Sequence, residues 1–437
     1  MPQKAKLLAW GIFLVYFIEN GTLGLIPRQM YFVYRNVRVS DLLIYFLAIY
    51  SFINIREFTE LYKSKTMIIA KILLCYLFLQ FIISVLLYDV NVLEYFFRLK
   101  GVWSSLLIFP YLLLLKRNGL KYLIKLVLPV AIVSNVLYIL SSFTGVAFLP
   151  EIGIEKQNLP GGFQVYRVYG GTFYGEFLFL GFVFQWMSSK IRWYQVLLVA
   201  LFALPQILAF GRSAWLFYTF SIILMAVWYT LRKREFRILI RQIIAISIFL
   251  GFVIYAFAKF VPDSSFMTDA LEARVLQGQD DVKYNEGTYG TRMANIQSLL
   301  GLWMNSNVLF GIGMHPLWVI KPLTVEENIY AWGFSDTGWP SVLAAYGLIG
   351  FIIALIFQLY YIIVSLKILK RADPKQITTF LVLLFLARLL FDSVLNYAYA
   401  GFSVGLWGFC SIVYFMAAVT YKYEHPDEQE LLNNKTG

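Results

Sequence analysis

Cysteine, histidine and charged residues are all scarce in this chain of 437 residues. The two cysteines, Cys75 and Cys410, stand in apolar runs, which argues against a disulfide framework or a thiolate metal site. The two histidines, His315 and His425, lie far apart, which argues against a histidine-bound zinc ion. Charged residues make up 14% of the chain, against about 25% in soluble domains. An ordinary soluble protein and a disordered chain are therefore both excluded.

Apolar residues dominate instead, at 60% of the chain. A membrane-spanning helix needs about 20 mostly apolar residues. Twelve segments qualify, two of them short: 7–26, 40–55, 67–88, 102–115, 121–148, 171–188, 192–210, 212–231, 238–260, 339–366, 377–395 and 398–421. We therefore predict an all-α polytopic membrane protein, with residues 1–437 forming one membrane domain. No internal repeat and no phosphate-loop, dinucleotide or catalytic-triad motif is present.

The net charge of +12 has two readings. A basic soluble protein would suggest nucleic acid, but no basic stripe lies outside the loops between apolar runs, so we expect no nucleic-acid partner. Basic loops of a membrane protein face the cytoplasm, and the strongest are LRKREFR at 231–237 and KILKRADPK at 367–375. This pattern predicts that both termini are cytoplasmic, with a tail at 422–437. Segment 27–40 departs from the pattern, because it places arginines outside, and we expect it to lie along the membrane interface.

The long segment 261–338 would then be a large extracytoplasmic loop. It begins turn-rich and mildly acidic, and the stretch TRMANIQSLLGLWM after it has apolar residues at roughly helical spacing. We expect one or two amphipathic helices there, lying against the membrane or the bundle. A loop of this length in a compact bundle is usually functional. The adjacent Asp280 and Asp281 are expected to be solvated rather than to hold a metal ion.

Three arginines stand on the predicted outer side, against the usual charge bias. Arg167 precedes the sixth span, Arg212 occupies the short turn between spans seven and eight, and Arg292 starts a predicted helix in the long loop. Arginine presents a planar, permanently charged fork that matches phosphate oxygens. Together they suggest an anion site suited to a lipid-borne diphosphate. Alternatively, each arginine reaches to lipid phosphate or pairs with an acidic residue.

A second group of charges lies in the outer halves of the spans. Arg388 and Asp392 are four residues apart and share a helix face, either as a mutually neutralising pair or as part of the site wall. Glu176 and Glu19 stand near the outer ends of their spans, where either could neutralise an arginine.

Polar and aromatic residues of the long loop are further candidates. Asp336 either caps the helix that follows or takes a proton from a hydroxyl acceptor. His315 precedes a proline and is expected to lie in a turn. Aromatic side chains of the loop either anchor at the headgroup level or stack on sugar faces; they are Trp303, Trp318, Tyr330, Trp332 and Trp339.

Four stretches, in order, resemble the O-antigen ligase and O-antigen polymerase superfamily of bacterial membrane proteins. They are RVYGGTFYGEFLFLG at 167–181, AFGRSAWL at 209–216, the run from Arg292 through VLFGIGMHPLW, and SDTGWPSVLAAYGLIGFII at 335–353. The resemblance implies a helical glycosyltransferase of the C type in the cytoplasmic membrane, acting at its outer face on undecaprenyl-diphosphate-linked glycans. It implies no cofactor and no metal.

Carried over by position, Arg212 and Arg292 would bind the donor diphosphate and Arg167 would contact the donor further. Asp336 stands where the family often has a histidine, and would serve as the catalytic base. We also expect Arg388 and Trp339 to bind the substrate. Because ligases rely on the missing histidine, the change favours a polymerase of repeat units over a ligase.

Two alternatives stay open: a ligase that transfers finished glycan, and a flippase or transporter. The expected partners are the lipid-linked glycan, membrane lipids and a chain-length regulator.

Overall fold

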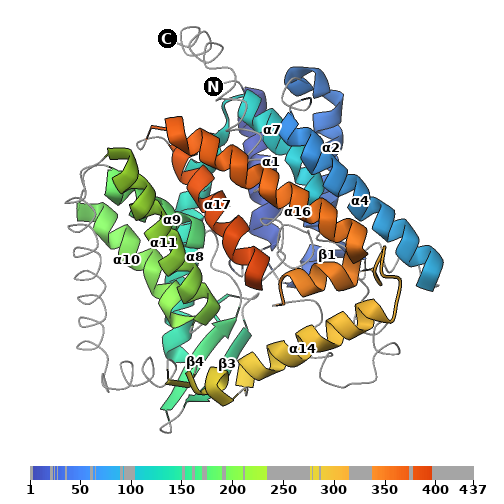
Figure 1. Ribbon diagram of the computed structural model, residues 1–437. Coiled ribbons are helices and arrows are strands. Elements are labelled where there is room, and N and C mark those ends of the chain that lie inside the picture. The colour runs from blue at the N-terminus through green and yellow to red at the C-terminus, as the bar shows by residue number, and fades with distance from the viewer. Residues whose placement is uncertain are drawn as a thin grey trace.

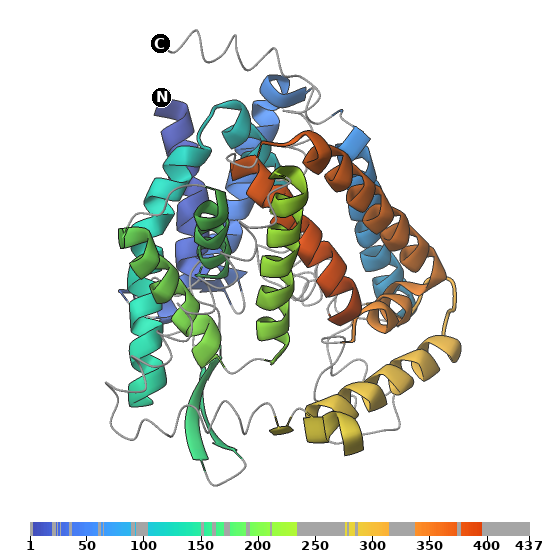
Figure 2. The same cartoon turned by 60° about the vertical axis from the view of Figure 1, so that its left-hand side comes forward.

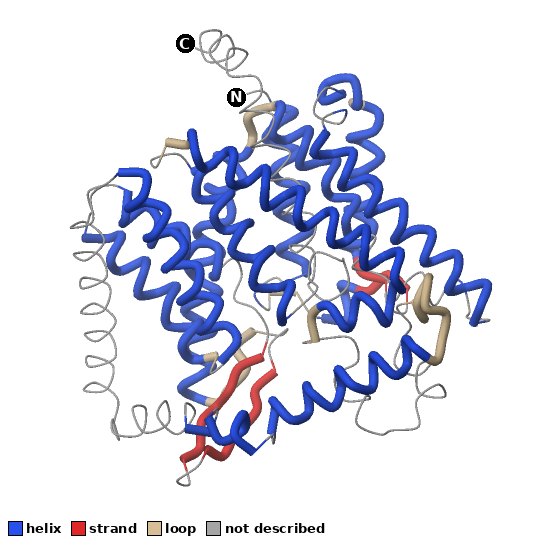
Figure 3. The backbone as a smooth tube through the Cα atoms, viewed as in Figure 1, coloured by secondary structure: helices blue, strands red, loops and turns tan. Residues whose placement is uncertain are grey.

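The computed structural model describes much of the bundle and part of the long loop. The described residues are 3–19, 23, 25–26, 28–34, 37–59, 63, 65–88, 92, 104–149, 153–159, 163–169, 175–188, 193–209, 212–233, 276–277, 279–284, 287–313, 337–373 and 377–395. Within them the protein is mostly helical, as Figure 3 shows.

The helices follow the predicted spans closely. Their bounds are α1 Gln3–Glu19, α2 Val39–Ile53, α4 Lys65–Tyr88, α7 Ile108–Lys116, α8 Leu120–Thr144, α9 Gly175–Ser188, α10 Trp193–Leu208, α11 Arg212–Lys233, α14 Gly287–Met304, α16 Trp339–Arg371 and α17 Ile377–Leu395. The predicted spans at 238–260 and 398–421 lie outside the described residues. Helix α14 confirms the helix expected in the long loop.

Among the described helices, three are long and apolar enough to cross a membrane: 121–144, 213–232 and 339–371. Four more are apolar but shorter, namely Val39–Ile53, Gly175–Met187, Tyr194–Leu208 and Thr379–Phe391. The number of twelve spans therefore stays a prediction.

The expectation of an all-α fold is wrong in one respect, because the structure contains two antiparallel hairpins. Strands β3 (Gly153–Leu159) and β4 (Phe163–Tyr169) pair with Glu155 opposite Arg167. The sequence carried a signal for this hairpin, since Pro-Gly-Gly separates two segments and the second, FQVYRVY, is rich in β-branched and aromatic residues. The hairpin is anchored to α8 by the Tyr138 hydroxyl, which donates to the Val168 carbonyl at 2.9 Å.

The second hairpin lies in segment 27–40, whose expected position along the membrane interface stays a prediction. Its described residues form a short 3-10 helix, η2 (Arg28–Tyr31), followed by β1 (Phe32–Tyr34) and β2 (Val37–Arg38). The Arg38 guanidinium lies 3.5 Å from Glu19, so Glu19 neutralises an arginine as anticipated.

The bundle has two groups of helices with α16 and α17 between them (Figure 1). One group contains α1, α2 and α7, and the other contains α9, α10 and α11, while α8 contacts both α1 and α10. Helix α17 packs against α11, α9 and α16, and α16 packs against α4 and α14. A continuous core of apolar and aromatic side chains fills the space between them, including the fully buried Phe202, Phe217, Phe357 and Tyr361.

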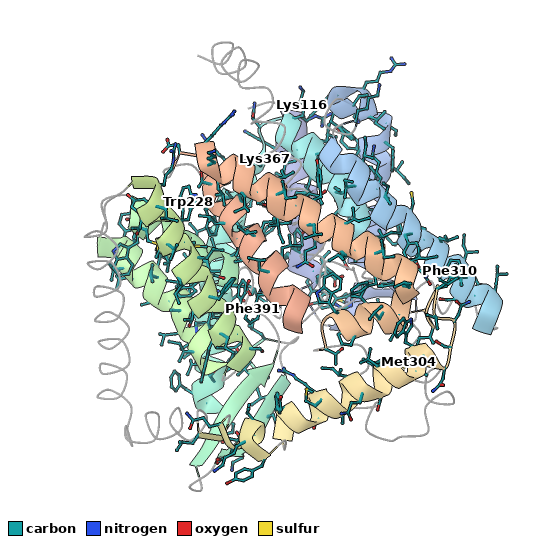
Figure 4. The ribbon with its side chains drawn as sticks, in the orientation of Figure 1. Lys116, Trp228, Met304, Phe310, Lys367 and Phe391 are labelled. Carbon is teal, nitrogen blue, oxygen red and sulfur yellow. The ribbon has the colours of Figure 1, made fainter. Side chains whose placement is uncertain are left out.

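The two ends of the bundle differ in character. At the basic end, which carries Lys116 and Lys367 (Figure 4), Trp228 Nε1 donates to the Leu369 carbonyl at 3.2 Å and Arg232 Nε to the Ala372 carbonyl at 3.3 Å. These bonds join the two strongly basic segments of the sequence. The opposite end, here called the loop end, carries the β3–β4 hairpin and α14, which lies across the ends of the helices (Figure 2).

An ion pair at the basic end gives a pH prediction. Arg117 donates to both carboxylate oxygens of Glu57, at 2.9 and 2.7 Å, and these bonds lower the pKa of Glu57. A carboxylate with a lowered folded-state pKa stabilises the fold above its unfolded pKa, and this contribution is lost as pH falls from about 4.3 through the lowered pKa. Because Glu57 is 40% exposed, we expect less than about 1 kcal/mol.

The measurement is the thermal midpoint in detergent between pH 3 and pH 7, for the wild type and for Glu57→Gln. We expect the wild type to lose its advantage over the variant as the pH falls. A constant difference across this range would contradict the assignment.

Candidate functional site

The predicted arginines lie on three different elements of the chain. Arg167 is in β4, Arg212 is the first residue of α11, and Arg292 is in the first half of α14. The side chains of Arg167 and Arg212 lie outside the described part of the structure. Helix α10 ends at Leu208, which confirms the short connection before Arg212. The hairpin and α14 both belong to the loop end (Figure 1).

An acidic residue lies beside the start of helix α14. Gly287 has φ +57, and a Cβ there would lie 2.7 Å from the Asp281 carboxyl carbon. Asp281 is buried, whereas Asp280 is exposed. The expectation of a solvated pair is therefore wrong for Asp281. A carboxylate beside a helix N-terminus is electrostatically favourable, which gives Asp281 a structural role.

Arg388 on α17 is engaged by protein groups. Its guanidinium forms an ion pair with Glu176 on α9 and lies 3.9 Å from the centre of the Phe217 ring on α11. Glu176 thus neutralises an arginine, as anticipated. The side chain of Asp392, the other predicted partner, lies outside the described part. A guanidinium that is both paired and stacked is well placed to join α9, α11 and α17.

Polar contacts missed by the sequence reasoning continue this cluster toward α10. The Tyr218 hydroxyl on α11 donates to Gln206 Oε1 at 2.6 Å, and Trp215 Nε1 donates to the Gln206 carbonyl at 3.1 Å. Tyr218 also interacts with Glu176. A glutamine inside a long apolar run, six residues before Arg212, was the available signal. These bonds fix the start of α11, where Arg212 lies, against its neighbours.

Helix α16 is broken at Gly347, where φ is +65 and ψ is −170. In a continuous helix, three backbone bonds would cross this residue, from the amides of 348, 349 and 350 to the carbonyls of 344, 345 and 346. The break leaves all six groups in need of new partners. In a membrane each unsatisfied group costs several kcal/mol, so a break must be matched by other parts of the protein.

The segment that follows α14 supplies four of the six partners. The amides of Ile312 and Gly313 donate to the carbonyls of Ala344 and Ala345, at 2.9 and 2.8 Å. In return, the Leu348 amide donates to Val308 and the Ile349 amide to Leu309, at 2.9 and 3.1 Å. Residues 308–313 therefore fill the break, and we call this arrangement the interlock.

The interlock explains why glycines are needed in the motif-like stretches. Gly311 has φ +71, and a Cβ there would lie 2.5 Å from the Gly347 nitrogen. A Cβ on Gly350 would lie 2.7 Å from the Tyr76 ring. Two glycines within the stretches that resemble the superfamily are thus needed for the close approach of two backbones and one ring.

The tryptophans near the interlock are used in packing. Trp303 Nε1 donates to the Val308 carbonyl at 2.9 Å. The Trp339 ring meets the Phe351 ring edge-on, with centroids 5.0 Å apart. In a straight helix, residues 339 and 351 would be about 18 Å apart along the axis, so this contact exists because α16 is broken between them. Trp339 therefore orients the first segment of α16 against the second.

The remaining predicted site residues fall outside the described part of the structure. Asp336, His315, Trp318, Tyr330 and Trp332 belong to this group. Within the described ranges, no group of three or more His, Cys, Asp or Glu side chains is placed to hold a metal ion.

The described helices and the interlock define an apolar, membrane-type bundle with α14 and the β3–β4 hairpin at one end. Residues 195–355 match the family model described as O-antigen ligase. The match runs from α10 to the second segment of α16, and it confirms the resemblance to the O-antigen ligase and polymerase superfamily. It supports membrane-integral activity of a glycosyltransferase type on lipid-linked glycans. No curated protein matches the chain.

Proposed function

We propose that this protein polymerises undecaprenyl-diphosphate-linked oligosaccharide repeat units at the outer face of the bacterial cytoplasmic membrane. The supporting observation is that the family match contains Arg212 and Arg292, which begin α11 and lie in α14, respectively. The basic end of the bundle would face the cytoplasm, as the positive-inside rule expects. The loop end, with the arginines, would then face outward.

The proposed reaction needs no metal ion. The acceptor hydroxyl oxygen bonds to the anomeric carbon of the growing chain while the bond from that carbon to the diphosphate breaks. Negative charge rises on the departing diphosphate, and Arg212 and Arg292 would stabilise it as fixed, permanently charged donors. Asp336 would take the proton of the acceptor hydroxyl. Arg167 would contact the donor at the edge of the site.

The ligase alternative is favoured by the description of the matching family, O-antigen ligase. The polymerase proposal rests on Asp336 standing where the ligases have a histidine. The transporter alternative draws support from the broken helix, since discontinuous helices often hold transported solutes. Here, however, the groups freed by the break in α16 bond to the chain itself rather than facing a solute site.

The test is to size lipid-linked glycans in cells that lack the protein, complemented with wild type, Arg212→Ala or Arg232→Ala. Arg232 is a matched control, because it lies on the same helix at the basic end and is exposed. Losing one transition-state donor costs about 10²–10³ in rate. We therefore expect Arg212→Ala to accumulate single repeat units and Arg232→Ala to retain the long ladder.

Other outcomes separate the alternatives. Long lipid-linked chains in the Arg212→Ala strain would indicate a ligase. An unchanged ladder in both the variant and the deletion strain would overturn the enzyme proposal and favour a transporter.

A further inference from the structure

Helix α4 completes the interlock, although it lies outside both the family match and the four motif-like stretches. The Tyr76 hydroxyl donates to the Tyr346 carbonyl at 2.6 Å. The hydroxyl also lies near the backbone of Gly350. The Tyr346 carbonyl is one of the two groups at the break that residues 308–313 do not reach. A side-chain hydroxyl from another helix therefore bonds directly to the break in α16.

Gln80, one helical turn after Tyr76, orients this hydroxyl. Its Nε2 donates to Tyr76 Oη at 2.7 Å and to the Phe310 carbonyl at 2.9 Å. Tyr76 is 6% exposed and Gln80 is 3% exposed, so water does not compete for these bonds. Together the two side chains link α4 to the break and to the segment that fills it.

The interlock also fixes the position of two proposed site elements. Residues 305–313 lead directly from α14, which carries Arg292, and α14 packs against α16. The first segment of α16 begins at Trp339, three residues after Asp336. The relative placement of these elements therefore depends on how 308–313 sits in the break.

We propose that Tyr76, oriented by Gln80, is a positioning residue that holds α14 and the first segment of α16 in register for the reaction. This inference rests on the proposed function for its catalytic consequence, but not for its structural part. Tyr76→Phe keeps the ring that packs edge-on against Tyr346, with centroids 6.4 Å apart, and removes only the hydroxyl. It leaves the Tyr346 carbonyl at the break without that partner, in surroundings where water cannot replace it.

The structural part is tested by a distance between two spin labels, with both native cysteines replaced by serine. Gly301→Cys places a label on α14, where a Cβ would have no atom within 4 Å, and Leu343→Cys places one at a half-buried position in the first segment of α16. We expect Tyr76→Phe to broaden or shift the distance distribution. Tyr111→Phe is the matched control, since Tyr111 is equally buried but bonds to Tyr16, away from the break. An unchanged distribution in Tyr76→Phe would overturn the proposal.

The catalytic part is tested in liposomes, with lipid-linked repeat units extracted from the deletion strain as substrate. We expect Tyr76→Phe to lower kcat about tenfold, when the rate is normalised to the amount of monodisperse protein. The KM for the repeat unit should be nearly unchanged. Gln80→Leu should show the same pattern, and Tyr111→Phe should match wild type. A broadened distance with unchanged kcat would overturn the catalytic role. A normal rate for Arg212→Ala in the same assay would instead count against the proposed function.

Discussion

Gly347→Ala is expected to cause the largest loss of folded protein of any single methyl addition in the described part of the bundle. The backbone of Gly347, at φ +65 and ψ −170, lies in a region that essentially only glycine adopts, and for other residues it costs about 1–3 kcal/mol. The added Cβ would overlap the Leu309 carbonyl and lie 2.5 Å from the Gly311 nitrogen. Neither is a flexible side chain that could move aside.

The variant can relieve this strain in one way, by straightening α16 into a continuous helix. Alanine favours a continuous helix by about 1 kcal/mol over glycine. Straightening, however, would strip residues 308–313 of four backbone hydrogen bonds and separate Trp339 from Phe351. We therefore expect a lower thermal midpoint and loss of the glycan ladder, whichever conformation the variant adopts.

The measurement is fluorescence-detected size exclusion after heating, combined with glycan sizing. Gly301→Ala is the matched control, because no atom lies within 4 Å of a Cβ at that position of α14. It should be neutral or slightly stabilising. A wild-type midpoint and ladder for Gly347→Ala would show that the break in α16 is not needed.

Arg388→Met is expected to cause the second-largest loss of stability, because it removes the counter-charge of the Glu176 carboxylate. In the structure that carboxylate is paired with a guanidinium that also stacks on Phe217. Removing one partner of a largely buried pair leaves an uncompensated charge, and at about 30% exposure we expect a loss of about 2 kcal/mol. Glu176→Gln should cost less, because an amide needs no counter-charge.

The double variant decides what Arg388 does. If the pair is structural, Arg388→Met with Glu176→Gln should recover part of the lost stability and retain the glycan ladder. If Arg388 binds the donor diphosphate, the double variant should fold and yet accumulate single repeat units. Thermal midpoints of the four proteins give the coupling free energy, and additive losses would contradict a direct pair.

Much of the helical fold could be predicted from the sequence, since apolar runs of sufficient length have few alternatives to a helix in a membrane. Segments 67–88, 212–231 and 377–395 each coincide with a helix to within two residues. The hairpins were not predicted, because a search for apolar runs of about 20 residues does not detect short segments of alternating polarity. The β3–β4 hairpin depends on its anchor to α8 through Tyr138, which no local pattern reveals.

The candidate site was likewise predicted in part from the sequence. Residue type and position along the spans identified Arg212 and Arg292 as candidates, and identified Glu19 and Glu176 as neutralising acids. The partner of Glu176 could not be predicted, because Arg388 lies 212 residues away in the sequence. Proximity of that kind is created by packing.

The sequence by itself determined that this is a mostly helical, membrane-type protein with strongly basic segments, because hydrophobicity and charge act locally along the chain. It also carried the glycines at 311, 347 and 350, without saying why they are needed. Only the tertiary structure decided that α16 is broken, that residues 308–313 fill the break and that Tyr76 completes it. The physical reason is that backbone groups freed in a membrane must find partners, and those partners come from segments up to 270 residues away.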